Sequence, residues 1–244
     1  FSNAYLAVAS KGAESFKTVF AKYNSTRKEE FQIRTAILEE NGKRYVENTP
    51  LTENAAGHIS SMSEKYEKLS KVNSGVKVLA PVYSEDKKAV RFEFLKGRTL
   101  AEILGEQIRG KKAPVEALKA AIDQVFGQAV LKNEPFAPTD PFKEVFGDSE
   151  DVLSLQDTSY EVSNIDGLFE NLMETEDGLY CMDYEWVFDF PIPSGFVRYR
   201  NLVYFYYKYE GLMEYENATQ FLKEFGMDEK LAETYASMEV AFQT

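Results

Sequence analysis

The sequence has one cysteine, Cys181, and one histidine, His58, among its 244 residues. A single cysteine rules out an intramolecular disulfide, and such cysteine usage is typical of proteins from a reducing compartment. A chain with a single histidine and a single cysteine cannot supply the usual ligands of a zinc site. His58 stands beside Ile59 in a predicted helix, where packing or capping is a more ordinary interpretation than general-base catalysis.

Long apolar runs and excess positive charge are also missing. No stretch approaches the roughly 18 apolar residues that a membrane-spanning helix needs, and no signal peptide is visible. Because 28 basic residues stand against 40 acidic ones, giving a formal charge of −12, we expect no nucleic-acid partner. The content of 44% hydrophobic and 14% aromatic residues is that of a folded protein.

The part of the chain up to Leu95 is predicted to consist mainly of β-strands. Apolar and polar residues alternate in it, and Asn41-Gly42 is among the strongest short signals for a hairpin. One helix interrupts the strands; Thr52 or Asn54 is expected to cap it, and it is expected to end near Leu69. The expected strands are 4–9, 16–23, 31–38, 44–48, 76–83 and 89–95.

After Leu95 the pattern favours helices, so we predict an N-terminal lobe at 1–95 and a C-terminal lobe at 96–244. Thr99 suits the cap of the first helix in this second lobe, and Pro114 suits the first turn of the next. The expected helices are 100–108, 114–131, 214–225 and 228–242.

Two other segments of this lobe stand out. Residues 133–160 contain several prolines and acids and read as a long loop, which in a compact domain is functional or mobile. The aromatic segment 196–209 is expected to be buried core, with a platform for a sugar ring as the alternative. Arg198 and Arg200 within it are expected either to extend their charged ends to solvent or to form ion pairs, with Glu185 or Asp189 as the partners.

A second hairpin is predicted within the C-terminal lobe. Glu176-Asp177-Gly178 separates two short strands, and Asp-Gly readily adopts the positive φ angles of a tight turn. Asp166 and Asn171 precede the first strand and Asp183 follows the second, so we expect their side chains to converge at one end of the hairpin. Converging carboxylate and amide oxygens suit Mg²⁺ and the phosphates that it carries.

The order of strands, one helix, a connecting segment, helices and a hairpin resembles the protein-kinase-like fold, most closely its aminoglycoside and choline phosphotransferase branch. Asp166 to Asn171 matches the D-x-x-x-x-N spacing of the kinase catalytic loop. Asp183-Tyr184-Glu185-Trp186 matches the D-x-E form of the metal-binding motif in those small-molecule kinases. We therefore expect an α+β fold with two lobes: an antiparallel sheet with one helix, then a mainly helical lobe with a catalytic β-hairpin.

The resemblance implies ATP and Mg²⁺ as cofactors. It implies that Asp166 orients or deprotonates the acceptor hydroxyl, while Asn171 and Asp183 hold Mg²⁺ on the nucleotide. It also implies that the backbone of Glu93 and Leu95 contacts adenine.

Three positions depart from the family's pattern. Asn164 stands where the family has a histidine before the catalytic aspartate. Asn24-Ser25-Thr26 stands in place of a Gly-rich phosphate loop, and a solvated turn is its more ordinary interpretation. Asn48 falls on or near the position of the phosphate-pairing lysine, and a neutral amide cannot replace an ammonium opposite polyphosphate.

The acidic partner of that lysine would lie on the first helix, at Glu64 or Glu67. We favour Glu67 as the nucleotide-site residue beside Asn48, because it is expected nearer the buried face. Without a lysine partner, a solvated helix charge is the more ordinary interpretation of either glutamate, and an active and an inactive site are both open.

Three short sequences resemble kinase-like modules in large bacterial proteins that assemble surface polysaccharides: 163–166, 183–193 and Tyr199-Arg200. Those proteins carry methyltransferase or glycosyltransferase domains on the same chain. The similarity implies a cytoplasmic module cut from a longer parent chain, with an association at the inner membrane face through that parent left open. The implied partners are a sugar or glycan acceptor and the neighbouring domains.

Two hypotheses follow. The first is an ATP- and Mg²⁺-dependent phosphotransferase acting on a hydroxyl of a sugar or surface-glycan end. The alternative is a catalytically weakened, pseudokinase-like module that binds a glycan or organises neighbouring domains. A glycosyltransferase or methyltransferase fragment is a weaker possibility, and no Rossmann-like Gly-rich turn follows the first strand as the latter would need.

Overall fold

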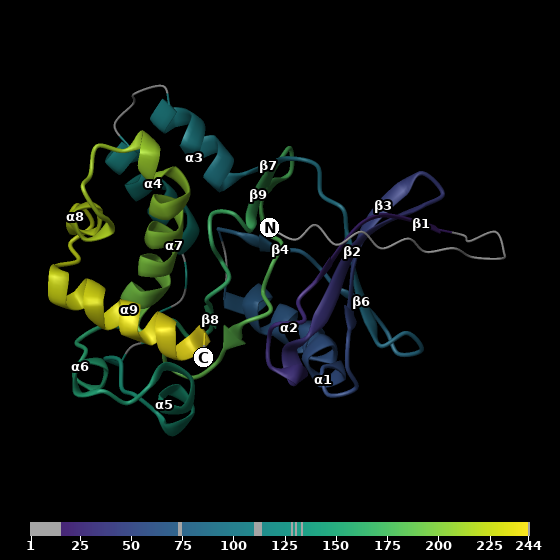
Figure 1. Cartoon of the computed structure of the whole chain (residues 1–244), viewed down its shortest axis with the longest axis horizontal. Helices are drawn as coiled ribbons and strands as arrows, with labels where there is room; N and C mark the ends of the chain where they lie inside the picture. The colour runs from purple at the N-terminus through teal and green to yellow at the C-terminus, as the bar shows by residue number, and fades with distance from the viewer. Residues whose placement is uncertain are drawn as a thin grey trace. The chain divides into compact units, whose positions relative to one another are not determined.

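The computed structural model shows two compact units, and each is described by itself (Figure 1). The first unit comprises Phe1–Ser61 and Ala80–Phe94, and the second comprises Met62–Leu79 and Leu95–Thr244. The described residues are 16–72, 75–109, 114–127, 129, 131–132 and 134–243. The strand predicted at 4–9 lies outside them. No helix in these ranges is long and apolar enough to span a membrane.

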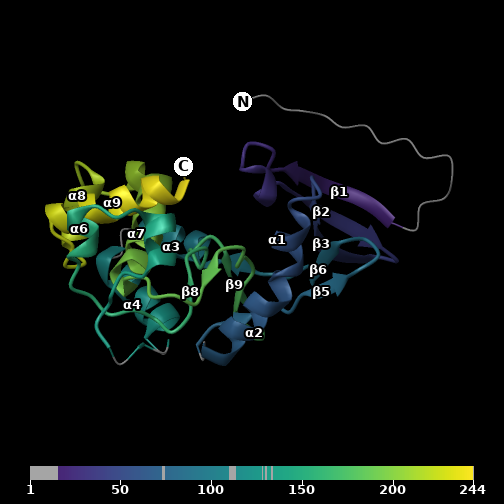
Figure 2. The same ribbon diagram turned by 90° about the horizontal axis from the view of Figure 1, so that it is seen from below.

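A five-stranded antiparallel sheet forms the first unit, in the order β1-β2-β3-β6-β5. Its strands are β1 (Phe16–Tyr23), β2 (Ile33–Glu40), β3 (Lys43–Pro50), β5 (Val82–Ser84) and β6 (Ala89–Glu93). Two short helices, η1 (Glu29–Phe31) and α1 (Ala56–Ser60), accompany the sheet, and α1 packs against β3 and β6 (Figure 2). Ile33, Ile59 and Val90 are fully buried, so apolar burial stabilises this helix on the sheet.

The turn between β2 and β3 is the hairpin predicted from Asn41-Gly42. Both turn residues have positive φ angles, 51° and 75°, and Glu40 pairs with Lys43 across the turn. Glycine and asparagine adopt such angles at little cost, and this explains why the pair closes two-residue hairpins. β3 continues to Pro50, beyond its predicted end.

The single helix predicted after this hairpin is in fact two helices. α1 ends at Ser60, and α2 (Met62–Val72) belongs to the second unit. Ser61 separates them, and its hydroxyl donates to the backbone carbonyl of His58 at 2.8 Å. A serine hydroxyl that bonds a nearby carbonyl competes with the helical hydrogen-bond ladder, which accounts for the interruption.

The second unit is mainly helical and carries two small sheets, ordered β4-β10-β9-β7 and β11-β8. Besides α2, its longer helices are α3 (Leu100–Arg109), α4 (Pro114–Phe126), α7 (Ser194–Tyr209) and α9 (Glu229–Gln243). Its shorter helices are α5 (Asp140–Phe146), α6 (Glu150–Leu153), η2 (Glu210–Leu212) and α8 (Ala218–Lys223). Its strands are β4 (Lys77–Val78), β7 (Arg98–Thr99), β8 (Ser163–Asn164), β9 (Leu172–Thr175), β10 (Gly178–Cys181) and β11 (Val187–Phe188). The predicted α+β class is confirmed.

The interpretation of 133–160 as a long loop was wrong in part, because α5 and α6 lie within it. Each begins at a hydroxyl cap: Thr139 accepts from the N–H of Phe142, and Ser149 accepts from the N–H of Val152. Phe142 is fully buried, so these short helices fasten the segment to the core rather than leaving it as loop.

Helix α7 packs against α8 and α9 in the second unit (Figure 1). Most of its aromatic residues are core, as predicted, with Phe196 and Phe205 almost completely buried, whereas Tyr207 is exposed. At its first turn, the carboxylate of Asp157 accepts from the N–H of Gly195 at 2.8 Å and from the hydroxyl of Tyr235 in α9 at 3.0 Å. A carboxylate at a helix N-terminus is favourable, and this one also joins two helices.

Candidate functional site

The predicted catalytic hairpin is formed by β9 and β10. The two strands pair in antiparallel register from Leu172 with Cys181 to Thr175 with Gly178, and Gly178 has a φ of 123°. Beyond the last pair, the N–H of Met182 donates to the carbonyl of Asn171 at 2.9 Å. Asn171 and Asp183 therefore leave the hairpin at the same end, as the sequence predicted.

Asn164 at the end of β8 connects the two aspartates. Its Oδ1 accepts from the N–H of Asp166 at 3.0 Å, and its Nδ2 donates to the carbonyl of Asp183 at 3.1 Å. The side-chain amide of Asn171 donates to the carbonyl of Asp166 at 2.9 Å. Two amides thus fix the backbone of Asp166 at the open end of the hairpin, beside the residues that flank both of its strands. A side chain that donates and accepts together suits this bridging role.

Backbone donors orient both carboxylates. Oδ2 of Asp166 accepts from the N–H of Trp186 at 3.0 Å, and Oδ1 of Asp183 accepts from the N–H of Glu185 at 3.3 Å. The D-x-E segment that supplies these donors is held in turn by the pairing of β11 with β8. The orientation of both aspartates is therefore set by a small sheet rather than by a free loop.

Two buried residues of α7 hold the segment that carries Asp166. Arg200 donates to the carbonyl of Ile165 at 2.6 Å. Asn201 accepts from the N–H of Phe169 at 2.8 Å and donates to the carbonyl of Gly167 at 3.1 Å. The sequence did not single out Asn201, and its only signal was a polar residue inside an aromatic helix.

The expected ion pairs of Arg198 and Arg200 were wrong in their partners. Arg200 pairs with Glu239 of α9 at 2.8 Å, and Asp189 pairs instead with Lys68. Arg198 donates to the hydroxyl of Tyr160 at 3.2 Å.

Lys65 of α2 is a functional candidate that the sequence analysis missed. Its ammonium donates to the backbone carbonyl of Glu185 at 2.5 Å. Burial lowers the pKa of Lys65, and attraction to Glu185, Asp166 and Asp183 acts in the opposite direction. The signal was present in the helical period, because Lys65 follows Met62 by three residues.

Glu67 of α2 does not lie nearer the buried face, as was expected of it. Glu64 and Glu67 are both exposed, so the reason for favouring Glu67 does not hold. Lys68 lies between Glu64 and Asp189, at 2.8 Å and 2.7 Å. The helix therefore directs a lysine, and neither of these glutamates, to the segment beside Asp166.

The remaining predicted nucleotide residues are divided between the units. Asn48 and Glu93 belong to the first unit, where Asn48 pairs with Thr35 and Val90 of the neighbouring strands. The Asn48 side chain is buried, at 8% exposure, and its Oδ1 has no hydrogen-bond partner among the described residues. Leu95 belongs to the second unit. The roles given to these residues stay predictions.

The predicted donor set fits a magnesium ion by its chemistry. Asn171 and Asp183 would supply one amide and one carboxylate oxygen ligand, and Mg²⁺ in proteins takes one or two carboxylates while keeping several waters. Within the described ranges, no three Asp, Glu, His or Cys side chains form a metal cluster of their own. A closed all-protein cage is thus not what these residues build. The set suits an ion that arrives with the phosphates.

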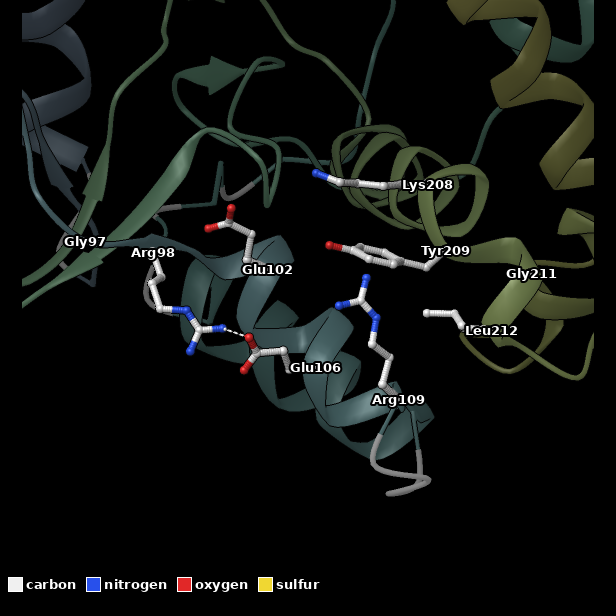
Figure 3. Close-up of a pocket in the computed structure, with 9 residues that line it drawn as sticks. All are labelled: Gly97, Arg98, Glu102, Glu106, Arg109, Lys208, Tyr209, Gly211 and Leu212. Carbon is white, nitrogen blue, oxygen red and sulfur yellow. Dashed lines mark ion pairs between the residues drawn. The ribbon is translucent and has the colours of Figure 1, made fainter.

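A separate hollow of about 890 Å³ lies in the second unit between α3, the end of α7 and η2 (Figure 3). Glu102, Lys208 and the hydroxyl of Tyr209 point into it (Figure 3). Arg98 pairs with Glu106 on its wall at 2.6 Å, and Lys208 pairs with Glu170 of the candidate site's own segment at 2.9 Å.

The element order is that of the kinase-like fold which the sequence resembled: a five-stranded sheet, an inserted helix, then a segment and hairpin that carry Asp166, Asn171 and Asp183. No family model and no curated protein sequence matches this chain.

Solved structures of phosphotransferases are among those that match it. Macrolide 2'-phosphotransferase MphH from Brachybacterium faecium has 11% identity and a TM-score of 0.42, over 91% of this chain and 83% of that chain. A thermostable mutant of aminoglycoside phosphotransferase APH(4)-Ia, in a complex with ADP and hygromycin B, has 10% identity and a TM-score of 0.44, over 92% and 94%. WaaP in complex with acyl carrier protein has 12% identity and a TM-score of 0.43, over 86% and 85%.

Proposed function

We propose that the chain is a phosphotransferase that uses ATP and Mg²⁺ and phosphorylates a hydroxyl of a sugar or glycan end. The observation that carries the proposal is the junction at Asn164, whose amide ties Asp166 to Asp183. Phosphoryl transfer requires mainly positioning and charge neutralisation, so the fixed placement of the backbones of these two aspartates supports it. Residues 1–95 and 96–244 act as the two lobes, and the backbone of Glu93 and Leu95 contacts adenine.

The reaction is a single displacement at phosphorus. The acceptor hydroxyl oxygen bonds to the γ-phosphorus of ATP, the bond from that phosphorus to the β–γ bridging oxygen breaks, and ADP leaves. The hydroxyl proton passes to the carboxylate of Asp166, which the N–H of Trp186 keeps oriented. Asn171 and Asp183 would hold Mg²⁺, whose charge, when it is bound, offsets that of the phosphates.

The choice of acceptor is supported by the sequence similarity of 163–166 and 183–193 to modules of surface-polysaccharide proteins. That similarity also supports a cytoplasmic setting beside methyltransferase or glycosyltransferase domains of one parent chain.

Magnesium-dependent binding of ATP, measured by calorimetry, tests the proposal. Asp183→Ala is expected to weaken binding at least about tenfold, because it removes a carboxylate ligand of the metal. Asp166→Asn is expected to keep ATP affinity and to slow transfer by about 10²-fold or more, because it removes the proton acceptor. Asp177→Ala is the matched control, since this exposed carboxylate lies at the opposite end of the same hairpin. Unchanged affinity in Asp183→Ala would contradict the proposed metal site.

A second candidate function is a catalytically weakened module that binds a glycan or organises neighbouring domains. The buried, neutral side chain of Asn48 on β3 favours it, because the family places a lysine there. A thermal shift with MgATP separates the two candidates, since a ligand that binds the native state raises Tm. No shift at millimolar nucleotide would favour the module.

A further inference from the structure

The candidate site brings several acidic side chains together. Asp166 and Asp183 are joined through Asn164, and Glu185, a third acid, is buried at 5% exposure two positions after Asp183. A polyphosphate brought to these groups adds further negative charge, of which a bound metal ion offsets only part. Asn48 is neutral and supplies no positive charge. A further cation near these groups would favour the binding of ATP.

Lys65 is placed to contribute that charge. It lies three residues after Met62 and four before Leu69, both buried, so the helical period directs it to the packed face of α2. Its ammonium is half-buried and donates to the carbonyl of Glu185 at 2.5 Å. An ammonium has three N–H donors, so Lys65 can keep this contact while it binds a phosphate oxygen.

The next lysine of the same helix has a different environment. Lys68 lies one residue before Leu69, and it pairs with Glu64 at 2.8 Å and with the exposed Asp189 at 2.7 Å. Its charge is therefore matched at the surface, away from the carbonyl that Lys65 contacts. The helix thus contains a site lysine and a surface lysine one turn apart.

We propose that Lys65 is the phosphate-binding cation of the nucleotide site, supplied by α2 instead of by the third strand. This inference rests on the proposed function. Where the family has a lysine on the strand and an acid on the helix, this chain has Asn48 on the strand and Lys65 on the helix. On this basis the positive charge that Asn48 lacks is supplied by Lys65 and is not missing from the site.

The experiment compares Lys65→Gln with Lys68→Gln by calorimetry, using ATP, ADP and adenosine in Mg²⁺. Glutamine keeps a hydrogen-bond donor for the Glu185 carbonyl but has no charge. Lys65→Gln is expected to weaken ATP binding by about 10- to 100-fold, ADP binding by less, and adenosine binding hardly at all. Lys65→Arg, which keeps the charge, is expected to recover most of the ATP affinity. Lys68→Gln is expected to match the wild type with all three ligands.

The outcomes distinguish this inference from the function on which it rests. A wild-type protein that binds no MgATP overturns both. A wild type that binds it, with equal affinity in Lys65→Gln, overturns the inference alone. An equal loss for ATP and adenosine also overturns it, because a purely structural contact would affect every ligand alike.

Lysine modification of the wild type provides a test that needs no variant to fold. With residues identified by mass spectrometry, MgATP is expected to protect Lys65 from acetylation, whereas adenosine leaves it as reactive as in the free protein. Lys68 should react equally in every sample. Equal reactivity of Lys65 with MgATP and with adenosine would overturn the proposal.

Discussion

At the scale of single residues, asparagine side chains make many of the hydrogen bonds that position the backbone of the candidate site. Asn164 joins Asp166 to Asp183, Asn171 bonds the carbonyl of Asp166, and Asn201 bonds the same segment from α7. A carboxamide donates and accepts at once, so it can bridge a backbone N–H and a carbonyl that a carboxylate or an alkyl group cannot.

Asn201→Ala is expected to lower the free energy of unfolding by about 1–3 kcal/mol, because the buried N–H of Phe169 and carbonyl of Gly167 lose their partner. It should also slow transfer more than it weakens ATP binding, since it loosens the segment of Asp166. Urea unfolding and a transfer assay measure the two effects. Asn217→Ala, which removes the exposed cap of α8, is the control. It should lower the free energy of unfolding by about 1 kcal/mol and leave transfer unchanged. Unaltered transfer in Asn201→Ala would refute the positioning role.

The sequence predicted that Asp166, Asn171 and Asp183 lie beside one hairpin because their spacing and the turn are local features, and their catalytic and metal-binding roles stay predictions. Sequence reasoning missed Lys65, although the helical period shows that residue on the packed face, because the family pattern directed attention to glutamates. It could not find the pair of Arg200 with Glu239, since that contact depends on how α7 and α9 pack.

At the scale of elements, the start of α7 and the middle of α9 meet with no space for an added methyl group. A Cβ on Gly195 would lie 2.2 Å from the hydroxyl oxygen of Tyr235 and 2.8 Å from a carboxylate oxygen of Asp157. Gly195 thus allows the carboxylate to bond both helices.

Gly195→Ala is expected to destabilise the protein by about 1–3 kcal/mol in urea unfolding, because the methyl group overpacks this junction. The loss of unfolding free energy should be smaller in a Tyr235→Phe background, because the hydroxyl oxygen nearest to the added methyl group is then absent. A double-mutant cycle measures this difference. Gly211→Ala is the control, since a Cβ there has no neighbour within 4 Å. The same cost in both backgrounds would mean that Tyr235 is not the obstacle.

Elements were predictable where turn or cap chemistry defines them. Asn41-Gly42 and Asp177-Gly178 predicted their hairpins; Asn41, Gly42 and Gly178 have positive φ, which few residues accept, whereas Asp177 does not. The break between α1 and α2 at Ser61 was not predictable in this way. It coincides with one hydroxyl hydrogen bond, and the helical spacing of the apolar residues continues across it. The caps at Thr139 and Ser149 were visible in the sequence, but the surrounding prolines favoured a loop.

At the scale of the whole molecule, the chain has two compact units but a single thiol. Cys181 lies in the second unit, is 2% exposed, and has a pKa that burial raises to about 12. Because the native pKa is raised, the native thiol stays protonated at pH 8, whereas an unfolded thiol with a pKa of about 8.5 is partly thiolate.

At pH 8, a thiol reagent is therefore expected to label Cys181 only as the second unit unfolds, with a urea midpoint equal to that of its helical circular dichroism. An exposed thiol introduced by Ser70→Cys in a Cys181→Ala background should react at once in native buffer. Rapid labelling of the wild type without urea would show that the second unit opens locally around β10.

The hydrogen bond from the backbone of Trp186 to Asp166 has an optical consequence. Trp186 is the chain's one tryptophan, and its indole lies edge-on to Phe242 with ring centroids 5.2 Å apart. All of the protein's tryptophan emission therefore arises from the residue whose N–H holds the carboxylate assigned to the acceptor. A change in the intensity or wavelength of that emission on adding nucleotide or sugar would report occupancy of the site directly, without any added dye.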